Sequence, residues 1–488
     1  MSSSAHPASR SSLFFVSDRP WLSLLFIAAM AVVFLWCSGH DEQRCVQLVL
    51  LAIFAGPVIA GRSAAKAIAG MRPVARLCLA AFFTLGAISA SMTFSLRHAA
   101  YEWSILLLLL LAAALLAAEL ARSGKAGLQA VLYCMGVACL LYSLRVVLMY
   151  AAALTSGIHI DMHMLAVGFS NARFLNHTQT ALLPLVVLLC MHAPKRTVMR
   201  RVWFVLAAFW WALLFVSEAR ATILAFGAAG LAVLVLRRSH ARTLLQMMAL
   251  TALAGVVVYV FGFILLPMLA GQGAIGMPSN VVARTAADPS SGRTLLWTLA
   301  LQLIATHPWL GVGPQHFAHE GAKLYIGAHP HDWLLQIGAE WGLPALLCLL
   351  VAAISGIRAL AGSGKRIEEG DVHNQQILAA LLTACAAIFV DGLFSGVLVM
   401  PQSQLAIALV IGCAGGWLHS LDAGMVQPAP SPATRSVTAV LAAVALCTLA
   451  WSIAPDFLRH AKGEVLTPTE RAINDKAHWP RLWEAGYF

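Results

Sequence analysis

The chain has 488 residues, of which 60% are hydrophobic and only 11% are charged, and its mean hydropathy is +0.80. Because soluble domains carry about 25% charged residues, this composition excludes a soluble globular protein and indicates a polytopic membrane protein. The net charge of +11 does not indicate a nucleic-acid partner, since the basic residues lie in short loops between apolar runs, where membrane topology places them.

Apolar runs of about 20 residues recur from Trp21 onward, and each is long enough to cross a bilayer as a helix. No short apolar core with a small-residue cleavage site precedes them, so we expect the first run to be a retained helix rather than a signal peptide. The expected spans, about thirteen in all, cover residues 21–37, 45–60, 77–94, 104–121, 128–154, 177–193, 202–217, 221–236, 244–270, 332–357, 377–400, 403–420 and 436–453.

The loops between these spans alternate in charge. Basic clusters such as the one at 195–201 recur at every second loop, and the intervening short loops carry at most one or two basic residues. The positive-inside rule therefore places the N-terminal tail, residues 1–20, in the cytoplasm, and it places the 271–331 loop and the C-terminal tail, residues 454–488, outside.

The expected fold class is an all-α polytopic membrane protein with about 12–13 transmembrane helices and a large helical extracytoplasmic loop. Helices 1–9 fall within residues 21–270, the loop covers 271–331, and helices 10–13 fall within 332–453. Within the loop, Thr294–Thr306 predicts a helix at the membrane interface, which Gly311 and the residues after it interrupt. The ten cysteines lie in or beside apolar runs and show neither zinc spacing nor a paired framework, so they are interpreted as core residues.

Arg220 and Arg293 are the first candidates for a site on the outer side. Arg220 lies where one span ends and the next begins, at a position that positive-inside sorting does not explain. Arg293 opens the expected interfacial helix, where a guanidinium and the helix N-terminus could together bind phosphate. The structural alternatives are an ion pair between Arg220 and Glu218, and contact of Arg293 with lipid headgroups.

The segment His329-Pro330-His331-Asp332 leads directly into the tenth span. A histidine near its ordinary pKa can accept a proton from a hydroxyl nucleophile, so His331 is the candidate general base. Metal binding by the two histidines with Asp332 is an alternative, but the segment lacks a third clear ligand and no metal is expected. A carboxylate beside His331 could raise its pKa, which leaves open whether His329 or His331 is the base.

Three further residues draw attention because polar groups inside or at the end of a span need partners. Asp391 lies near the outer end of one span and could orient a histidine or an arginine. Arg145 lies inside the fifth span and could bind an anion or pair within the protein. His177, at the outer start of the sixth span, is interpreted as structural.

Several familiar catalytic motifs do not occur in this sequence. The segment 362–366 is not a P-loop, and no G-x-G-x-x-G, H-E-x-x-H or G-x-S-x-G is found. No acidic pair suggests a divalent metal, and no cofactor is expected. Phosphate charge would have to be handled by arginine.

A set of short segments in this order and topology resembles one family. The segments are Ser217-Glu-Ala-Arg220, Gly292-Arg293-Thr-Leu-Leu-Trp297, Pro308-Trp-Leu-Gly-Val-Gly313, His329-Pro-His-Asp-Trp-Leu-Leu-Gln336 and Glu340-Trp-Gly-Leu-Pro344. The chain is similar here to the O-antigen ligase/polymerase superfamily of bacterial membrane glycosyltransferases, which includes O-linked protein oligosaccharyltransferases. Where that family usually has asparagine after the histidine, this chain has Asp332.

The resemblance implies a multi-pass protein of the bacterial inner membrane whose active site faces the periplasm. Its donor would be a glycan on a polyprenyl (undecaprenyl) pyrophosphate carrier, with Arg220 and Arg293 holding the pyrophosphate and His331 activating the acceptor hydroxyl. His329, Asp391, Arg145 and Asp332 are candidates for substrate binding. Transfer would be metal-independent and would invert the anomeric carbon.

The acceptor stays open at this level. Lipid A–core, as in lipopolysaccharide biosynthesis, is the first expectation, and an exported protein such as a pilin or a growing O-antigen repeat are the alternatives. Acceptor choice is expected to lie in residues 155–176, 271–290 and the C-terminal tail. A transporter is the alternative from another class, but it would scatter charges through several spans rather than gather them on one face.

Overall fold

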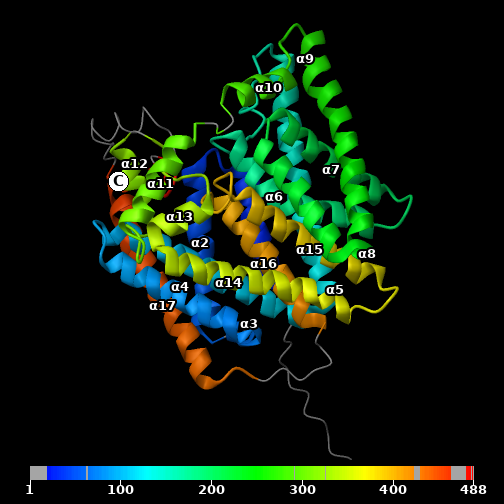
Figure 1. Cartoon of the computed structure of the whole chain (residues 1–488). Helices are drawn as coiled ribbons and strands as arrows, with labels where there is room; N and C mark the ends of the chain where they lie inside the picture. Colours follow the sequence, from blue (N-terminus) through cyan, green and yellow to red (C-terminus); the bar gives the residue numbers. More distant parts are fainter. Residues whose placement is uncertain are drawn as a thin grey trace, which may run out of the picture.

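The computed structural model describes residues 19–61, 64–288, 290, 292–324, 326–421, 429–462, 480–484, 486 and 488. The expected N-terminal tail lies almost entirely outside these residues, and so do parts of the 422–435 connector and of the C-terminal tail. All regular elements in the described part of the chain are helices (Figure 1). They are α1 (Trp21–Trp36), α2 (His40–Ile59), α3 (Ala64–Gly70), α4 (Pro73–Ser91), α5 (Leu96–Thr155), α6 (Ala172–His192), α7 (Val198–Val216), α8 (Arg220–Tyr259), the π-helix η1 (Val260–Leu265), α9 (Leu266–Leu269), α10 (Pro278–Ala287), α11 (Thr294–Thr306), α12 (His316–Ala322), α13 (Trp333–Trp341), α14 (Leu343–Gly362), the 3₁₀ helix η2 (Ser363–Arg366), α15 (Val372–Asp391), α16 (Pro401–Leu421) and α17 (Pro432–Ala461).

Ten helices of the described chain are long and apolar enough to cross a membrane, and α1 and the first part of α8 are shorter apolar helices. The all-α polytopic fold expected from the sequence is therefore confirmed. The 60-residue α5 counts once among the ten, although Gly124 takes a non-helical conformation (φ +59°) inside it. Gly124 lies between the expected spans 104–121 and 128–154, so α5 consists of two helices that meet at this residue.

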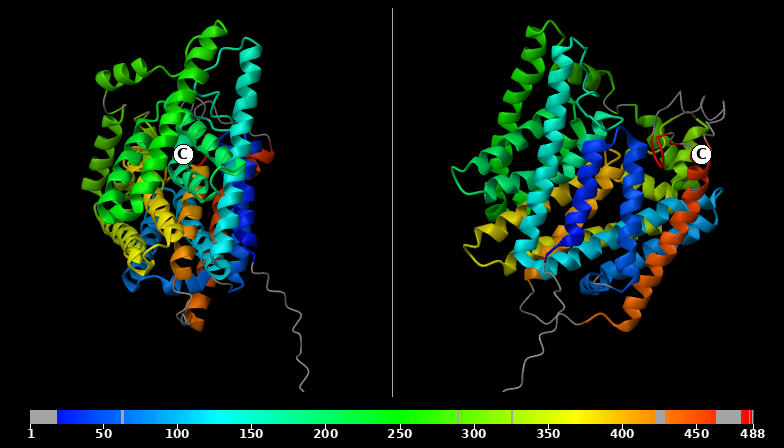
Figure 2. Two further views of the ribbon diagram at one scale, coloured as in Figure 1. Left: turned by 90° about the vertical axis from the view of Figure 1, so that its right-hand side faces the viewer. Right: turned by 180° about the vertical axis from the view of Figure 1, so that it is seen from behind.

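The core of the bundle is built around α5, which packs against α16, α1 and α17. Glycines allow the closest of these contacts: a Cβ on Gly416 would lie 2.5 Å from Leu120 Cβ, and one on Gly412 would lie 2.7 Å from Leu116 Cβ. Small residues that let two backbones approach are the usual means of helix packing in membranes. A second group, α6, α7, α8 and α15, packs beside this core, and Figure 2 shows it from two further sides.

The structure differs from the expected span 332–357 at Gly342. This residue has φ +86°, and a Cβ there would lie 2.3 Å from Trp309 O, so only glycine fits the close approach of the two backbones. The helix is broken at this point into α13, which is nine residues long, and α14, which is 20 residues long and apolar. The ring of Trp341 stacks on Phe82 of α4 with centroids 4.4 Å apart, and this contact fixes α13 against the bundle.

The expected interfacial helix is present with the expected bounds as α11, and α10 and α12 lie before and after it in the same loop. The last helix is longer than expected, since α17 runs from Pro432 to Ala461 rather than over 436–453. The final described residues lie beside α11 and α12, where Figure 1 marks the C-terminus.

Candidate functional site

The site is formed around the loop that joins α12 to α13, because this loop carries His329 and His331. The indole Nε1 of Trp297, one turn into α11, donates to Pro330 O at 3.1 Å. At the other end of the loop, Trp333 N donates to Gly392 O at 3.0 Å, just after α15. The loop is therefore held between α11 and the end of α15.

His331 has an unusual backbone conformation, with φ +55°. The left-handed region costs a non-glycine residue about 1–3 kcal/mol and persists only where the surroundings enforce it. Here the Trp297 and Trp333 contacts enclose the residue on both sides along the chain. This strained backbone conformation gives the side chain of His331 a direction that a relaxed backbone would not give it.

The two histidines of the loop are in contact but differ in their surroundings. Their ring centroids are 4.0 Å apart, and His331 N donates to His329 Nδ1 at 3.3 Å. His329 is only 2% exposed, and its ring packs so closely on Gly396 that a Cβ there would lie 2.7 Å from His329 Cε1. The side chain of His331 is partly exposed. His329 is enclosed with one ring nitrogen occupied, and His331 is the more accessible of the two.

Both histidines have pKa values well below the ordinary range. Burial is the largest cause for each, because it disfavours the charged ring. The positive charge of Arg293 lowers the pKa of His331 further, with smaller contributions from His177 and Arg173. His331 is thus neutral at pH 7, which is the form of the imidazole that can accept a proton.

Arg293 lies within electrostatic reach of two other arginines. The pKa of Arg293 falls to about 10, chiefly through burial and then through the positive charges of Arg173 and Arg220. Asp391 and Asp288 oppose this shift. Three guanidinium groups within electrostatic reach of one another favour an anionic ligand such as a phosphate or pyrophosphate.

Local hydrogen bonds position Arg293 at the start of α11. The carboxylate of Asp288 accepts from Ser290 N at 2.8 Å and from Gly292 N. Gly292 has φ +76°, which a residue with a side chain would rarely adopt. The resulting turn places Arg293 immediately before the first turn of α11, with Trp297 N donating to Arg293 O at 2.9 Å.

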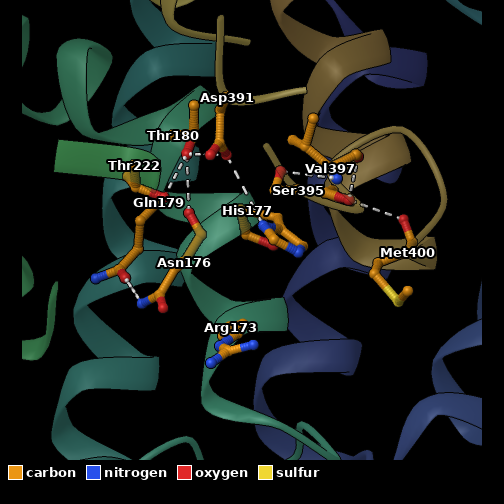
Figure 3. A network of polar contacts seen from close by, with 12 residues as sticks. Arg173, Asn176, His177, Gln179, Thr180, Thr222, Asp391, Ser395, Val397 and Met400 are labelled. Carbon is orange, nitrogen blue, oxygen red and sulfur yellow. Dashed lines mark hydrogen bonds and ion pairs between the residues drawn. The ribbon is translucent and has the colours of Figure 1, made fainter. Parts of the chain in front are cut away.

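A buried polar network joins Asp391 to the helices that carry the arginines (Figure 3). Thr180 Oγ1 lies 2.8 Å from Asp391 Oδ2 and 3.2 Å from Thr222 Oγ1, one turn or less from Arg220 on α8. His177 Nδ1 lies 3.8 Å from Asp391 Oδ2, and Asp391 is 0% exposed. Asp391 therefore connects α6, α8 and α15 at the level of the site, and it lies beside a histidine as the sequence suggested.

Helix α6 also holds the junction between α7 and α8, where Arg220 lies. Asn176 Nδ2 donates to Ser217 Oγ at 2.9 Å, and Arg220 N donates to Glu218 O at 2.9 Å. Glu218 has φ +54°, so the turn between α7 and α8 is sharp. Through Asn176, His177 and Thr180, α6 organises the surroundings of Arg220 and Asp391 together.

The structure shows the contacts of two further charged residues. Asp332 Oδ1 accepts from Leu334 N at 2.8 Å and from Leu335 N at 3.0 Å, so its carboxylate caps α13. It does not raise the pKa of His331, which is lowered. Arg145 donates to Phe34 O at 2.7 Å and to Cys37 O, so it caps the end of α1 and makes no contact with the site.

The structure also brings in residues that sequence reasoning missed or set aside. Arg173, at the start of α6, belongs to the arginine cluster, and the argument that singled out Arg220 would also have found it. His177 was interpreted as structural, yet it lies within reach of both Asp391 and His331. His316 and His319 pack elsewhere: His316 Nε2 accepts from Ser95 N at 3.0 Å, and the ring of His319 stacks on Phe94.

Among the described residues, no group of three or more His, Cys, Asp or Glu side chains is arranged to hold a metal ion. The residues that converge at the site are instead arginines, histidines and one buried aspartate. This arrangement fits a ligand that is an anion and a reaction that needs a proton acceptor.

The fold and site together define a polytopic α-helical membrane protein with a cationic, histidine-containing site where several helices end. Residues 203–350 match the family model described as O-antigen ligase, a range that contains Arg220, Arg293 and His331. This match supports the O-antigen ligase/polymerase superfamily, which the sequence motifs also suggested. A search of curated proteins found no match for this chain.

Proposed function

We propose that this protein is a membrane glycosyltransferase that moves a glycan from a polyprenyl-pyrophosphate carrier to an acceptor hydroxyl at the periplasmic face of the inner membrane. The family match supports an O-antigen ligase- or polymerase-type enzyme. The observation that carries the finer proposal is the gathering of Arg173, Arg220 and Arg293 beside a neutral His331.

In this proposal the arginines bind the donor through its pyrophosphate. Planar guanidinium groups form paired hydrogen bonds with phosphate oxygens and stabilise the charge that develops on the leaving group. Arg220 and Arg293 take this role, and Arg173 adds a third positive charge. Fixed cations of this kind can neutralise the phosphate charge, a role for which other transferases use a divalent metal.

His331 acts as the general base. The acceptor oxygen attacks the anomeric carbon as its proton passes to the neutral ring of His331, and the bond from that carbon to the phosphate oxygen breaks. The electron pair leaves with the pyrophosphate, and a single displacement of this kind inverts the anomeric carbon. Asp391, through His177 and Thr180, keeps the surroundings of the base and of Arg220 in place.

The first acceptor we propose is lipid A–core, which makes the protein an O-antigen ligase. Purified protein with a lipid-linked glycan and lipid A–core should show transfer that is insensitive to EDTA. The variants His331→Ala and Arg293→Ala should lose this activity, and His307→Ala, an exposed histidine of the same extracytoplasmic segment, should retain it. Full activity in both site variants would refute the assignment.

A gene deletion separates the acceptors. Loss of the lipopolysaccharide ladder supports ligation, and a mass change in one exported protein such as a pilin indicates protein glycosylation instead. A ladder collapsed to a single repeat indicates polymerisation. No transfer with any acceptor would favour the transporter alternative.

A further inference from the structure

The last described residues of the chain lie beside the loop that joins α12 to α13 and carries His329 and His331. We call it the catalytic loop, or the histidine loop. Arg481 is only 4% exposed, although it lies only seven residues before Phe488. Its Nη2 lies 2.7 Å from Glu102 Oε2 of α5 and 2.6 Å from Glu340 Oε2 of α13. Its Nη1 donates to Ala328 O at 3.3 Å. One guanidinium thus joins a transmembrane helix, the start of the histidine loop and the helix that follows it.

The backbone of this peptide is itself held by α2. Arg44, 2% exposed, donates from Nη2 to Arg481 O at 2.9 Å and from Nε to Leu482 O at 3.2 Å. Farther along, the ring of Phe488 stacks on His98 with centroids 3.7 Å apart, and Phe488 O lies 3.0 Å from His319 Nδ1. The peptide is therefore seated by specific contacts along its length.

Charge compensation alone would explain a buried arginine between two carboxylates. Burial raises the pKa of Glu340, and the guanidinium of Arg481 is the first influence that opposes this rise. Compensation does not explain the bond to Ala328 O, which is a neutral acceptor at the residue before His329. Because Arg481 bonds both Ala328 and Glu340, it spans the segment that contains His331, whose backbone is strained and needs such support.

We propose that Arg481 is a positioning residue for the catalytic loop and that the described C-terminal residues, 480–484, 486 and 488, are part of the active-site structure. Arg481 does not touch the reacting groups. It fixes the distance between the start of the loop and α13 and so holds His331 facing the arginine cluster. This inference rests on the proposed role of His331.

Two variants separate positioning from folding. Arg481→Gln removes the charge and leaves two buried carboxylates without their cation, so it tests the whole contact at the risk of poor folding. Arg481→Lys keeps the charge but loses the planar group that reaches three partners. Lys323→Gln is the matched control, since it breaks an exposed ion pair with Glu320 in the same extracytoplasmic segment.

The kinetic readout is transfer from the lipid-linked donor, resolved into kcat and donor KM. Misplacement of a catalytic group by about 1 Å can cost roughly 10²-fold in rate. We expect Arg481→Lys to fold and to lower kcat by about tenfold or more, with donor KM unchanged because the arginine cluster is intact. Lys323→Gln should match the unaltered protein. Unchanged kcat in Arg481→Lys, or a rise in its donor KM, would overturn the inference.

Hydrogen–deuterium exchange tests the same inference without any activity. Exchange in 326–341 should accelerate in both Arg481 variants and stay unchanged in Lys323→Gln. If the unaltered protein transfers no glycan, the proposed function fails while this measurement still reports on the loop. Exchange in 326–341 that equals the control in both variants would show that Arg481 does not hold the loop.

Discussion

The hydroxyl of Thr180 provides the sharpest test of the buried network around Asp391. Replacing Thr180 with valine keeps the shape of the side chain and removes the donor 2.8 Å from Asp391 Oδ2. Asp391 is 0% exposed, and its Oδ1 has no hydrogen-bond partner within the described part of the chain. Hydrogen bonds to charged groups contribute about 1.5–3 kcal/mol, so Thr180→Val is expected to lower the free energy of unfolding by about 2 kcal/mol.

Thr383→Val is the matched control for this prediction. Thr383 is also 0% exposed, but its hydroxyl donates to Ala379 O at 2.8 Å, within its own helix. Its replacement leaves no carboxylate without a donor, so the expected loss is below about 1 kcal/mol. Unfolding of the purified proteins in detergent micelles, followed by circular dichroism along a denaturant series, gives both free energies.

A third variant identifies the carboxylate as the cause. In an Asp391→Asn background the partner of Thr180 is neutral, so the effect of Thr180→Val should shrink to about 1 kcal/mol, as for a neutral hydrogen bond. Equal losses in Thr180→Val and Thr383→Val would refute the reasoning. So would a loss from Thr180→Val that is as large with asparagine as with aspartate at position 391.

Three further outcomes are expected at the catalytic loop. Gly396→Ala should destabilise the protein by about 1–3 kcal/mol and lower kcat, because the new Cβ would lie 2.7 Å from His329 Cε1. Trp297→Phe should cost about 1 kcal/mol and lower kcat with donor KM unchanged, since it removes the bond to Pro330 O. Because the pKa of His331 lies well below 6.5, kcat/KM should stay constant as pH falls through 6.5 and decline only at lower pH. The acid limb of kcat should lie at higher pH, since bound pyrophosphate offsets the arginine charges and favours the protonated ring.

Each of these outcomes has its own control. Gly227→Ala places a Cβ where nothing lies within 4 Å. A loss of stability equal to that of Gly396→Ala would therefore contradict the packing argument. Trp309→Phe changes a tryptophan between α11 and α12 that is 75% exposed, and this variant should behave like the unaltered protein. An acid limb of kcat/KM at or above pH 6.5 would contradict the assignment of a neutral, low-pKa His331 as the base.

Much of the site could be predicted from the sequence because membrane sorting makes charged residues conspicuous. Positive-inside sorting gives an arginine no reason to lie in a loop predicted to be outside, so Arg220 and Arg293 stood out, and the histidine loop followed from its position before a predicted span. The helix break at Gly342 was missed because α13 is apolar and runs directly into α14 without a polar gap. Its cause is the backbone of Trp309, which only the tertiary structure brings close.

Side-chain direction was the part that sequence patterns did not reveal. Asp332 and Asp391 are both carboxylates beside polar segments, but the first turns back to cap α13 and the second faces His177. Arg145, inside a span, could have bound an anion or paired within the protein, and its partners are carbonyls at the end of α1. The place of Arg481 depends on carboxylates hundreds of residues earlier, a pairing that local patterns do not encode.

The ion pairs of Arg481 with Glu102 and Glu340 have a consequence for biogenesis. Glu102 and Glu340 leave the ribosome long before Arg481 does, so the membrane must accept both acids while their cation is still being synthesised. A chain that lacked Arg481 would still contain the helices of the described residues and every proposed catalytic side chain, yet its acids would lack the guanidinium that lies between them here. Neutralisation of these two acids by Arg481 is therefore a late event in the insertion of this protein.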